Sequence, residues 1–443
     1  MKRLMNKLLI FILMFAALAA ARADDIDYDI SGYLYNLPIY QGETEYQFLD
    51  TTFKADDIFY DFTRVRVRPE LFLSENTRMR MDYELDFNVA SEKNFIPELQ
   101  GITNRQAVDL HWVLAKEDYF AATHFIDLLY IKHDFDFGEV TAGRQLITWG
   151  VGRVWQPTDM FLPINPQNFS KFEKDGADAL TAKYFLGDFS DIEVVYNFRE
   201  MWKDGNYGAR LRTNYDEYDI SLMGGMFDHR WNLGGDFAGN LFDAGFRGEG
   251  VFSFAKENID SNFVRVVFGL DYQFTSKFYA LVEYQFNGAG ASNKQGYSLD
   301  LVGKLLKGEI QNLSRNYVAV QGTYQLHPLW NLMLMNISNL NDQSGYVNAL
   351  VKYNIFEDMN ISFGGMITYG KIGTEYGMMP SAGYGIIEWY LNQGSEISGY
   401  SGAIYSGLLT SEVSRIVGKI LTEHLSLSGF VLCPRGTHVS TCV

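Results

Sequence analysis

The sequence predicts an all-β fold, a single transmembrane antiparallel β-barrel of about 18 strands with inward-folded loops and a short C-terminal tail. Three observations carry this prediction. Many segments alternate between apolar and polar residues, short connections alternate with long ones, and the chain begins with an export signal. Length alone would also allow several soluble domains, but no low-complexity linker divides residues 24–391.

The export signal occupies residues 1–23. Lys2, Arg3 and Lys7 precede an apolar run over 8–20, and Ala21-Arg22-Ala23 has the small-residue pattern of a cleavage site. The apolar run is about thirteen residues, whereas a spanning helix needs about twenty. A secretory signal peptide is therefore expected, with residues 24–391 as the barrel in the outer membrane of a Gram-negative type of cell.

Composition limits the classes of partner that the protein can bind. The net charge is −17, which argues against nucleic acid, and 15% of the residues are aromatic. Both cysteines lie near the end of the chain, so no disulfide framework holds the main body. We expect outer-membrane lipid, small hydrophilic solutes and the barrel-assembly machinery as partners, and no cofactor or metal; the oligomeric state stays open.

The stretch RVRVRPELFLSENTRMRMDYELDF, residues 64–87, shows the alternation most clearly. Successive side chains of a strand point to opposite faces, so one face of this hairpin is apolar and the other charged. In a membrane barrel the apolar face meets lipid and the charged face meets a water-filled lumen. The charged face carries Arg64, Arg66, Arg68, Glu70, Arg78, Arg80, Asp82, Glu84 and Asp86.

Alternating segments continue along the chain. Short connections are expected at the periplasmic side and long ones outside, which gives each strand a direction and requires an even total. The expected strands are 28–35, 61–73, 78–87, 125–137, 139–149, 180–186, 192–199, 207–215, 218–226, 231–239, 243–254, 262–274, 278–287, 317–326, 329–336, 347–355, 359–369 and 383–391.

Residues 392–443 fall outside this count. Val413, Ile416, Val417, Ile420 and Leu421 have helical spacing, which predicts an amphipathic tail. The alternative is a final hairpin, 411–421 and 423–432, that replaces 383–391 as the closing strand.

Three segments resemble a known group of proteins. AGRQLITWGVGRVWQPTDMFLPINP (142–166), DFAGNLFDAGFRGEG (236–250) and TEYGMMPSAGYGIIEWYL (374–391) are similar to motifs of alginate-export-type and related porin-like outer-membrane proteins. The resemblance implies a single barrel that passes a solute, with loops folded inward to narrow the pore.

The charged faces supply the expected pore lining. A three-residue turn at 74–76 would place Glu70 opposite Arg80, and Arg68, Arg66 and Arg64 opposite Asp82, Glu84 and Asp86, each pair favourable by roughly 0.2–1 kcal/mol. These charges would line a wet channel; alternatively, they only neutralise one another. Other expected lumen residues are Lys132, Arg210, Arg212, Arg265, Asp271 and Glu283.

The loop over residues 150–177 is the expected constriction. Its prolines restrict its conformations, and charges on an inward-folded loop can set the diameter and field of a pore. The alternative is an ordinary surface lid. The candidate constriction residues are Arg153, Trp155, Asp159, Phe161 and Lys171.

The favoured function is a channel, not an enzyme, for hydrophilic solutes, anions among them. Alternatives are a structural or adhesive barrel and a barrel-borne hydrolase. Histidines occur, but no serine motif accompanies them at the spacing of a Ser-His-acid set.

Overall fold

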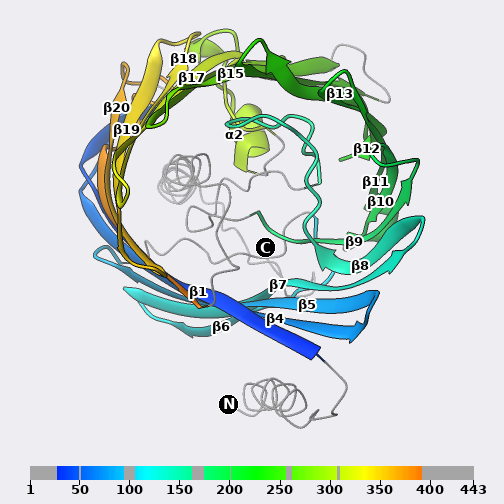
Figure 1. Cartoon of the computed structure of the whole chain (residues 1–443). Helices are drawn as coiled ribbons and strands as arrows, with labels where there is room; N and C mark the ends of the chain where they lie inside the picture. The colour runs from blue at the N-terminus through cyan, green and yellow to red at the C-terminus, as the bar shows by residue number, and fades with distance from the viewer. Residues whose placement is uncertain are drawn as a thin grey trace, which may run out of the picture.

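The computed structural model describes residues 27–48, 51–93, 105–161, 174–199, 201–255, 262–306 and 310–391. The predicted signal peptide, 1–23, and the predicted tail, 392–443, lie outside these ranges. The described strands form a closed ring around a central space (Figure 1).

The ring is an antiparallel β-barrel in which each strand pairs with its neighbours in the sheet and β1 closes it by pairing with both β4 and β21. Its strands are β1 (Asp27–Gln41), β4 (Ile58–Ser74), β5 (Thr77–Ala90), β7 (Phe120–Phe135), β8 (Gly138–Gln145), β9 (Ala177–Phe185), β10 (Asp191–Asn197), β11 (Asn206–Tyr215), β12 (Tyr218–Phe227), β13 (Arg230–Leu241), β14 (Ala244–Phe254), β15 (Phe263–Thr275), β16 (Phe278–Asn287), β17 (Asn316–His327), β18 (Trp330–Asn339), β19 (Ser344–Phe356), β20 (Met359–Tyr369) and β21 (Ala382–Leu391).

Smaller elements lie in the connections. β2 (Thr44–Phe48) and β3 (Thr51–Ala55) form a separate hairpin, and β6 (His111–Lys116) adds to β7 as an extra strand. The helix α2 (Leu299–Leu306) belongs to the connection between β16 and β17. None of the helices in the described ranges has the length and apolar character needed to span a membrane.

The predicted fold class and the prediction of about 18 strands are confirmed. The closing strand is also confirmed, since Tyr390 pairs with Tyr33 and Gly383 with Tyr40. Some boundaries were wrong. β1 runs on to Gln41 because its inward side chains, Leu37 and Ile39 among them, stay buried, whereas β8 ends at Gln145 where the chain leaves the wall.

The hairpin of β4 and β5 has the predicted register. Arg64 pairs with Asp86, Arg66 with Glu84, and Glu70 with Arg80. The predicted three-residue turn was wrong. β4 extends to Ser74, which pairs with Thr77, and a register irregularity between Phe72 and Ser74 takes up the difference.

Burial alternates along the strands as expected for a barrel wall. In β15, Phe268 is 48% exposed and Leu270 42% exposed on the outer face, whereas Val267, which directly precedes Phe268, is fully buried. A continuous outer band of such residues is what a lipid environment requires. We call the end of the barrel at which every connection between consecutive strands has two to five residues the short-turn end, and the other, which carries the long connections, the long-loop end.

Deleting residues 392–443 should leave a folded barrel, because β21 already pairs with both β20 and β1. We expect the shortened protein to reach outer membranes and to keep its heat-modifiable migration on a gel. As a control, deletion from 382 onward removes β21 and leaves two unpaired edges, so this variant should be degraded. Loss of the first variant as well would show that residues beyond Leu391 are needed for insertion.

Candidate functional site

The inner wall of β4 and β5 carries a compact network of ion pairs. Arg64 contacts Asp86 at 2.8 Å and Glu84 at 3.0 Å. Arg66 contacts Glu84 at 2.5 Å and Asp82 at 2.7 Å. All of these side chains are at most 5% exposed. The network therefore consists of neutralised, desolvated pairs rather than of free charges.

A third strand joins this network. Asp127 of β7 contacts Arg66 at 2.8 Å and lies where the register between β5 and β7 shifts, since Asp82 pairs with Leu128 and Tyr83 with Ile126. The bulge points one additional carboxylate inward, which strict alternation could not have predicted.

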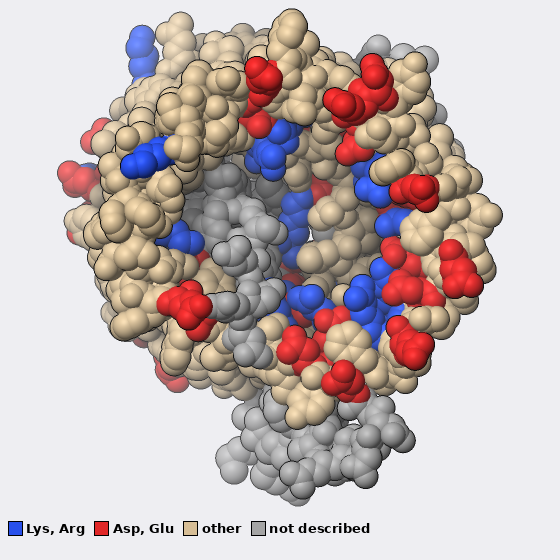
Figure 2. Space-filling view, viewed as in Figure 1, with Lys and Arg blue, Asp and Glu red and all other residues tan. Residues whose placement is uncertain are grey.

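The remaining predicted lumen charges pair mostly with neighbours on the same wall. Register and ion pairing differ in places: Arg80 contacts Asp82 of its own strand at 2.7 Å, and Glu70 contacts Arg78 at 3.6 Å. The other pairs are Arg68 with Asp82 (3.3 Å), Lys132 with Glu139 (2.5 Å), Arg210 with Asp236 (3.7 Å), Arg212 with Asp191 (2.8 Å) and Arg247 with Asp271. In Figure 2 basic side chains, with acidic ones beside them, are visible inside the central opening.

The part of the wall beside the network on β4 and β5 is aromatic and apolar. One buried cluster joins side chains of β1 with side chains of β17 to β21. It includes Tyr33, Tyr35, Tyr317, Met335, Tyr346, Met366, Tyr384 and Ile386. The lumen therefore has a charged side and a side rich in tyrosine.

The loop after β8 turns into the barrel, as Figure 1 shows. Glu283 of β16 holds it: its carboxylate accepts backbone N–H groups from Arg153 (2.7 Å), Val154 (3.0 Å) and Trp155 (2.7 Å). Hydrogen bonds to a charged acceptor are stronger than neutral ones. Glu283 is thus on the inner face as expected, but its oxygens are hydrogen-bonded to the loop backbone.

Two further carboxylates fix the same loop. Glu249 of β14 accepts the Val151 N–H at 3.4 Å and the Thr158 hydroxyl, and Glu193 of β10 accepts the Trp149 indole N–H at 2.8 Å. The loop therefore spans from β8 to anchors on three other strands.

The five predicted constriction residues differ in where the structure places them. Trp155 and Phe161 are buried and anchor the loop. The ring centroids of Trp155 and Tyr317 are 6.1 Å apart, and those of Phe161 and Trp149 are 4.9 Å apart. Asp159 is buried against Lys174. Arg153 is exposed. Lys171 lies outside the described residues.

A buried polar cluster at the long-loop end was missed by sequence reasoning. Glu375 accepts hydrogen bonds from the Leu313 backbone (2.9 Å), from Asn339 (2.7 Å) and from the Tyr317 hydroxyl. Its own N–H donates to Asp342 at 2.7 Å. These contacts join the β16–β17 and β20–β21 connections, which the alternation pattern treats as featureless loops.

This cluster should respond to pH. Burial raises the pKa of Glu375 to about 7, against the opposing hydrogen bond from the Leu313 amide. Because the pKa is raised in the folded protein, protonation of Glu375 stabilises the folded connection fully below pH 4.5, its ordinary pKa. This stabilisation is lost as the pH rises through about 7. Amide exchange of residues 370–381, measured as the ratio of wild type to Glu375→Gln, should rise over that range. A constant ratio would contradict the assignment.

No cluster suited to metal binding emerges from the described ranges. Three or more His, Cys, Asp or Glu side chains nowhere gather there around a potential metal position. The described contacts of His124 and His133 include the hydroxyls of Tyr83 (3.1 Å) and Thr77 (2.8 Å).

The architecture is similar to that of solved porins. A BenF-like porin from Pseudomonas fluorescens Pf-5 is 11% identical, with a TM-score of 0.50 over 82% of this chain and 98% of that chain. OpdL of Pseudomonas aeruginosa is 11% identical (TM-score 0.51, 82% and 99% covered), and OccK9 (OpdG) of the same species is 8% identical (TM-score 0.51, 82% and 98% covered). No family model and no curated protein matches the sequence. Similarity at this level of identity establishes a shared fold.

Proposed function

We propose that the protein is an outer-membrane channel for hydrophilic solutes, with the loop after β8 as its constriction. The observation that carries this proposal is the inverted polarity of the barrel, with apolar side chains such as Phe268 outside and ion pairs inside. A loop that is anchored across a polar lumen narrows the pore, so no soluble domain is needed to restrict passage. Export by the signal peptide and insertion by the barrel-assembly machinery belong to the same proposal.

We further propose that the constriction favours anions. Glu249 and Glu283 have their carboxylates occupied by loop groups, whereas Arg153 is exposed beside them. Arg265, on the inner face of β15, forms no ion pair with any described residue and lies over the Phe263 ring at 5.9 Å. The carboxylates keep their charge but turn their oxygens to the loop, whereas Arg153 and Arg265 are charged groups with no carboxylate partner among the described residues. The motif resemblance to alginate-export-type barrels supports the same class of solute, and membership of that family is part of this proposal.

Single-channel recording in planar bilayers tests the channel. We expect discrete conductance steps and, across a KCl gradient, a reversal potential that indicates preference for chloride. Arg153→Gln should shift that potential toward zero. An insulating, correctly inserted protein would refute the channel and favour a structural barrel instead.

Release of the loop provides a sharper test of the constriction. Glu283→Gln weakens three charge-assisted hydrogen bonds, each typically worth about 1.5–3 kcal/mol to stability. The segment 153–155 should therefore loosen while the Glu249 and Glu193 anchors remain, and the conductance should rise. Glu139→Gln is the matched control, because Glu139 is an inner-wall carboxylate paired with Lys132 and Lys183. Equal conductance of the two variants would show that the loop does not limit the pore.

A further inference from the structure

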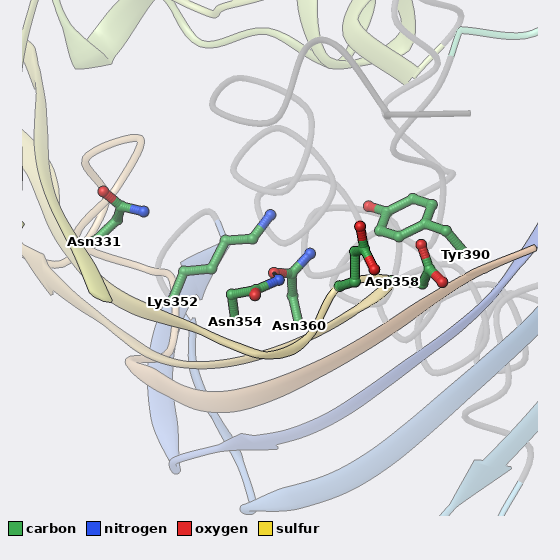
Figure 3. Close-up of a pocket in the computed structure, with 7 residues that line it drawn as sticks. Asn331, Lys352, Asn354, Asp358, Asn360 and Tyr390 are labelled. Carbon is green, nitrogen blue, oxygen red and sulfur yellow. Dashed lines mark hydrogen bonds between the residues drawn. The ribbon is translucent and has the colours of Figure 1, made fainter. Parts of the chain in front are cut away.

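A cavity of about 470 Å³ opens on the inner wall near the short-turn end, away from the anchored loop (Figure 3). Its volume is within the range of about 300–1,000 Å³ that is typical of small-molecule sites. Its lining is amide-rich and consists of Asn331, Lys352, Asn354, Glu357, Asp358, Asn360 and Tyr390.

Strand register builds this lining. Asn331 of β18 pairs with Lys352 of β19, and Asn354 of β19 pairs with Asn360 of β20. Asn360 in turn pairs with Glu388 of β21. Because paired residues lie on one face of a sheet, four adjacent strands present their polar groups to the same space. In Figure 3 these side chains rise from the wall into the cavity.

The lining is held in place by its own contacts. Asn354 donates to Asn360 at 3.1 Å, and the Tyr390 hydroxyl donates to Glu388 at 3.0 Å. Lys352 lies 3.2 Å from the other Glu388 oxygen. Asp358 keeps one buried carboxylate oxygen that has no hydrogen-bond partner. The site is therefore ordered by its own contacts, and one oxygen of its lining is left unsatisfied.

The charges exclude most anions from this cavity. Lys352 contributes one positive charge, whereas Glu357 and Asp358 contribute two negative charges, and Glu388 already accompanies the lysine. The amide side chains offer both donors and acceptors, which match hydroxyl groups that also do both. The Tyr390 ring supplies an apolar surface of the kind that covers the C–H face of a sugar ring.

We propose that this cavity is a binding subsite for neutral saccharides at the short-turn mouth of the barrel. The proposal rests on the proposed channel only in requiring that solutes reach the inner wall. It differs from the anion preference of the loop in both place and chemistry.

Binding of maltotriose to the full-length protein, folded in detergent micelles, tests the subsite by titration calorimetry. We expect Asn360→Ala and Tyr390→Ala each to weaken binding about tenfold. Tyr390→Phe, which keeps the ring, should retain most of the affinity and guards against a folding defect. Asn214→Ala is the control, because Asn214 is an amide near the short-turn end of β11 that donates to Asp219 at 2.9 Å, outside the cavity.

The dependence of binding on ionic strength and on ligand charge distinguishes a saccharide site from a cation site. Binding of a neutral sugar should be unchanged between low and high ionic strength, whereas a cation site would lose affinity. Preference for spermidine over maltotriose, or equal affinity of wild type and Tyr390→Ala, would overturn the proposal. A protein that conducts but does not bind maltotriose refutes the subsite alone. One that binds maltotriose but does not conduct refutes the channel alone.

Discussion

Replacing Arg66 with leucine should lower the free energy of unfolding by about 3–5 kcal/mol, the usual cost of breaking a buried ion pair. Arg66 is 1% exposed and contacts Asp82, Glu84 and Asp127. Its loss leaves three carboxylates close together with little water to solvate them. Urea titration of the protein folded in lipid vesicles, followed by tryptophan fluorescence, measures the change.

Arg212→Leu provides the matched control. Arg212 is also an inner-face arginine with a carboxylate partner, Asp191 at 2.8 Å, but its side chain is 50% exposed. Pairs this accessible contribute about 0–1 kcal/mol, so this variant should unfold close to wild type. If both arginines gave the same small loss, the network on β4 and β5 would be as well hydrated as the rest of the wall.

Placing an arginine on the outer face should be nearly as damaging. Phe268 lies near the middle of β15 and is 48% exposed on the apolar side, so Phe268→Arg is expected to cost roughly 2–4 kcal/mol in a bilayer. Arg265→Phe, three residues earlier on the inner face, should cost less and should alter ion selectivity instead. The same urea titration in vesicles compares the two.

Repeating the urea titration in detergent tests whether the bilayer causes the difference between the two variants. In micelles, which adapt to a local charge, the difference between Phe268→Arg and Arg265→Phe should shrink. Identical losses in bilayers would contradict the assignment of the two faces.

The strands and their pairing followed from short-range pattern. The apolar face of residues 64–87 limited the possible registers, because a slip by one residue would expose every apolar side chain to the lumen. The pairing of Arg66 with Glu84 was predicted correctly although the turn is shorter than expected, since the irregularity between Phe72 and Ser74 compensates for it. The closing strand followed from the parity of short and long connections. β6 was missed because six residues, HWVLAK, give too short an alternation to separate from a loop.

The candidate site depended on contacts that no local pattern encodes. Glu283 looks like any other inward charge on β16, and only the folded chain brings it to Arg153, 130 residues earlier. The bulge at Asp127 and the buried Glu375 were missed for the same reason, since both depend on packing between residues far apart in the sequence. A register shift or a loop contact is decided by packing against distant residues, whereas alternation reports only which face of a strand is apolar.

The way Glu283 holds the loop bears on how such a protein can diverge. Its carboxylate binds the backbone N–H groups of Arg153, Val154 and Trp155, and every amino acid except proline carries that group. Point mutations at Arg153, whose side chain is exposed, can therefore change the group that faces the pore while the tether persists. Natural variation can alter solute preference one residue at a time without rebuilding the barrel, and proline is the one replacement that selection should exclude there.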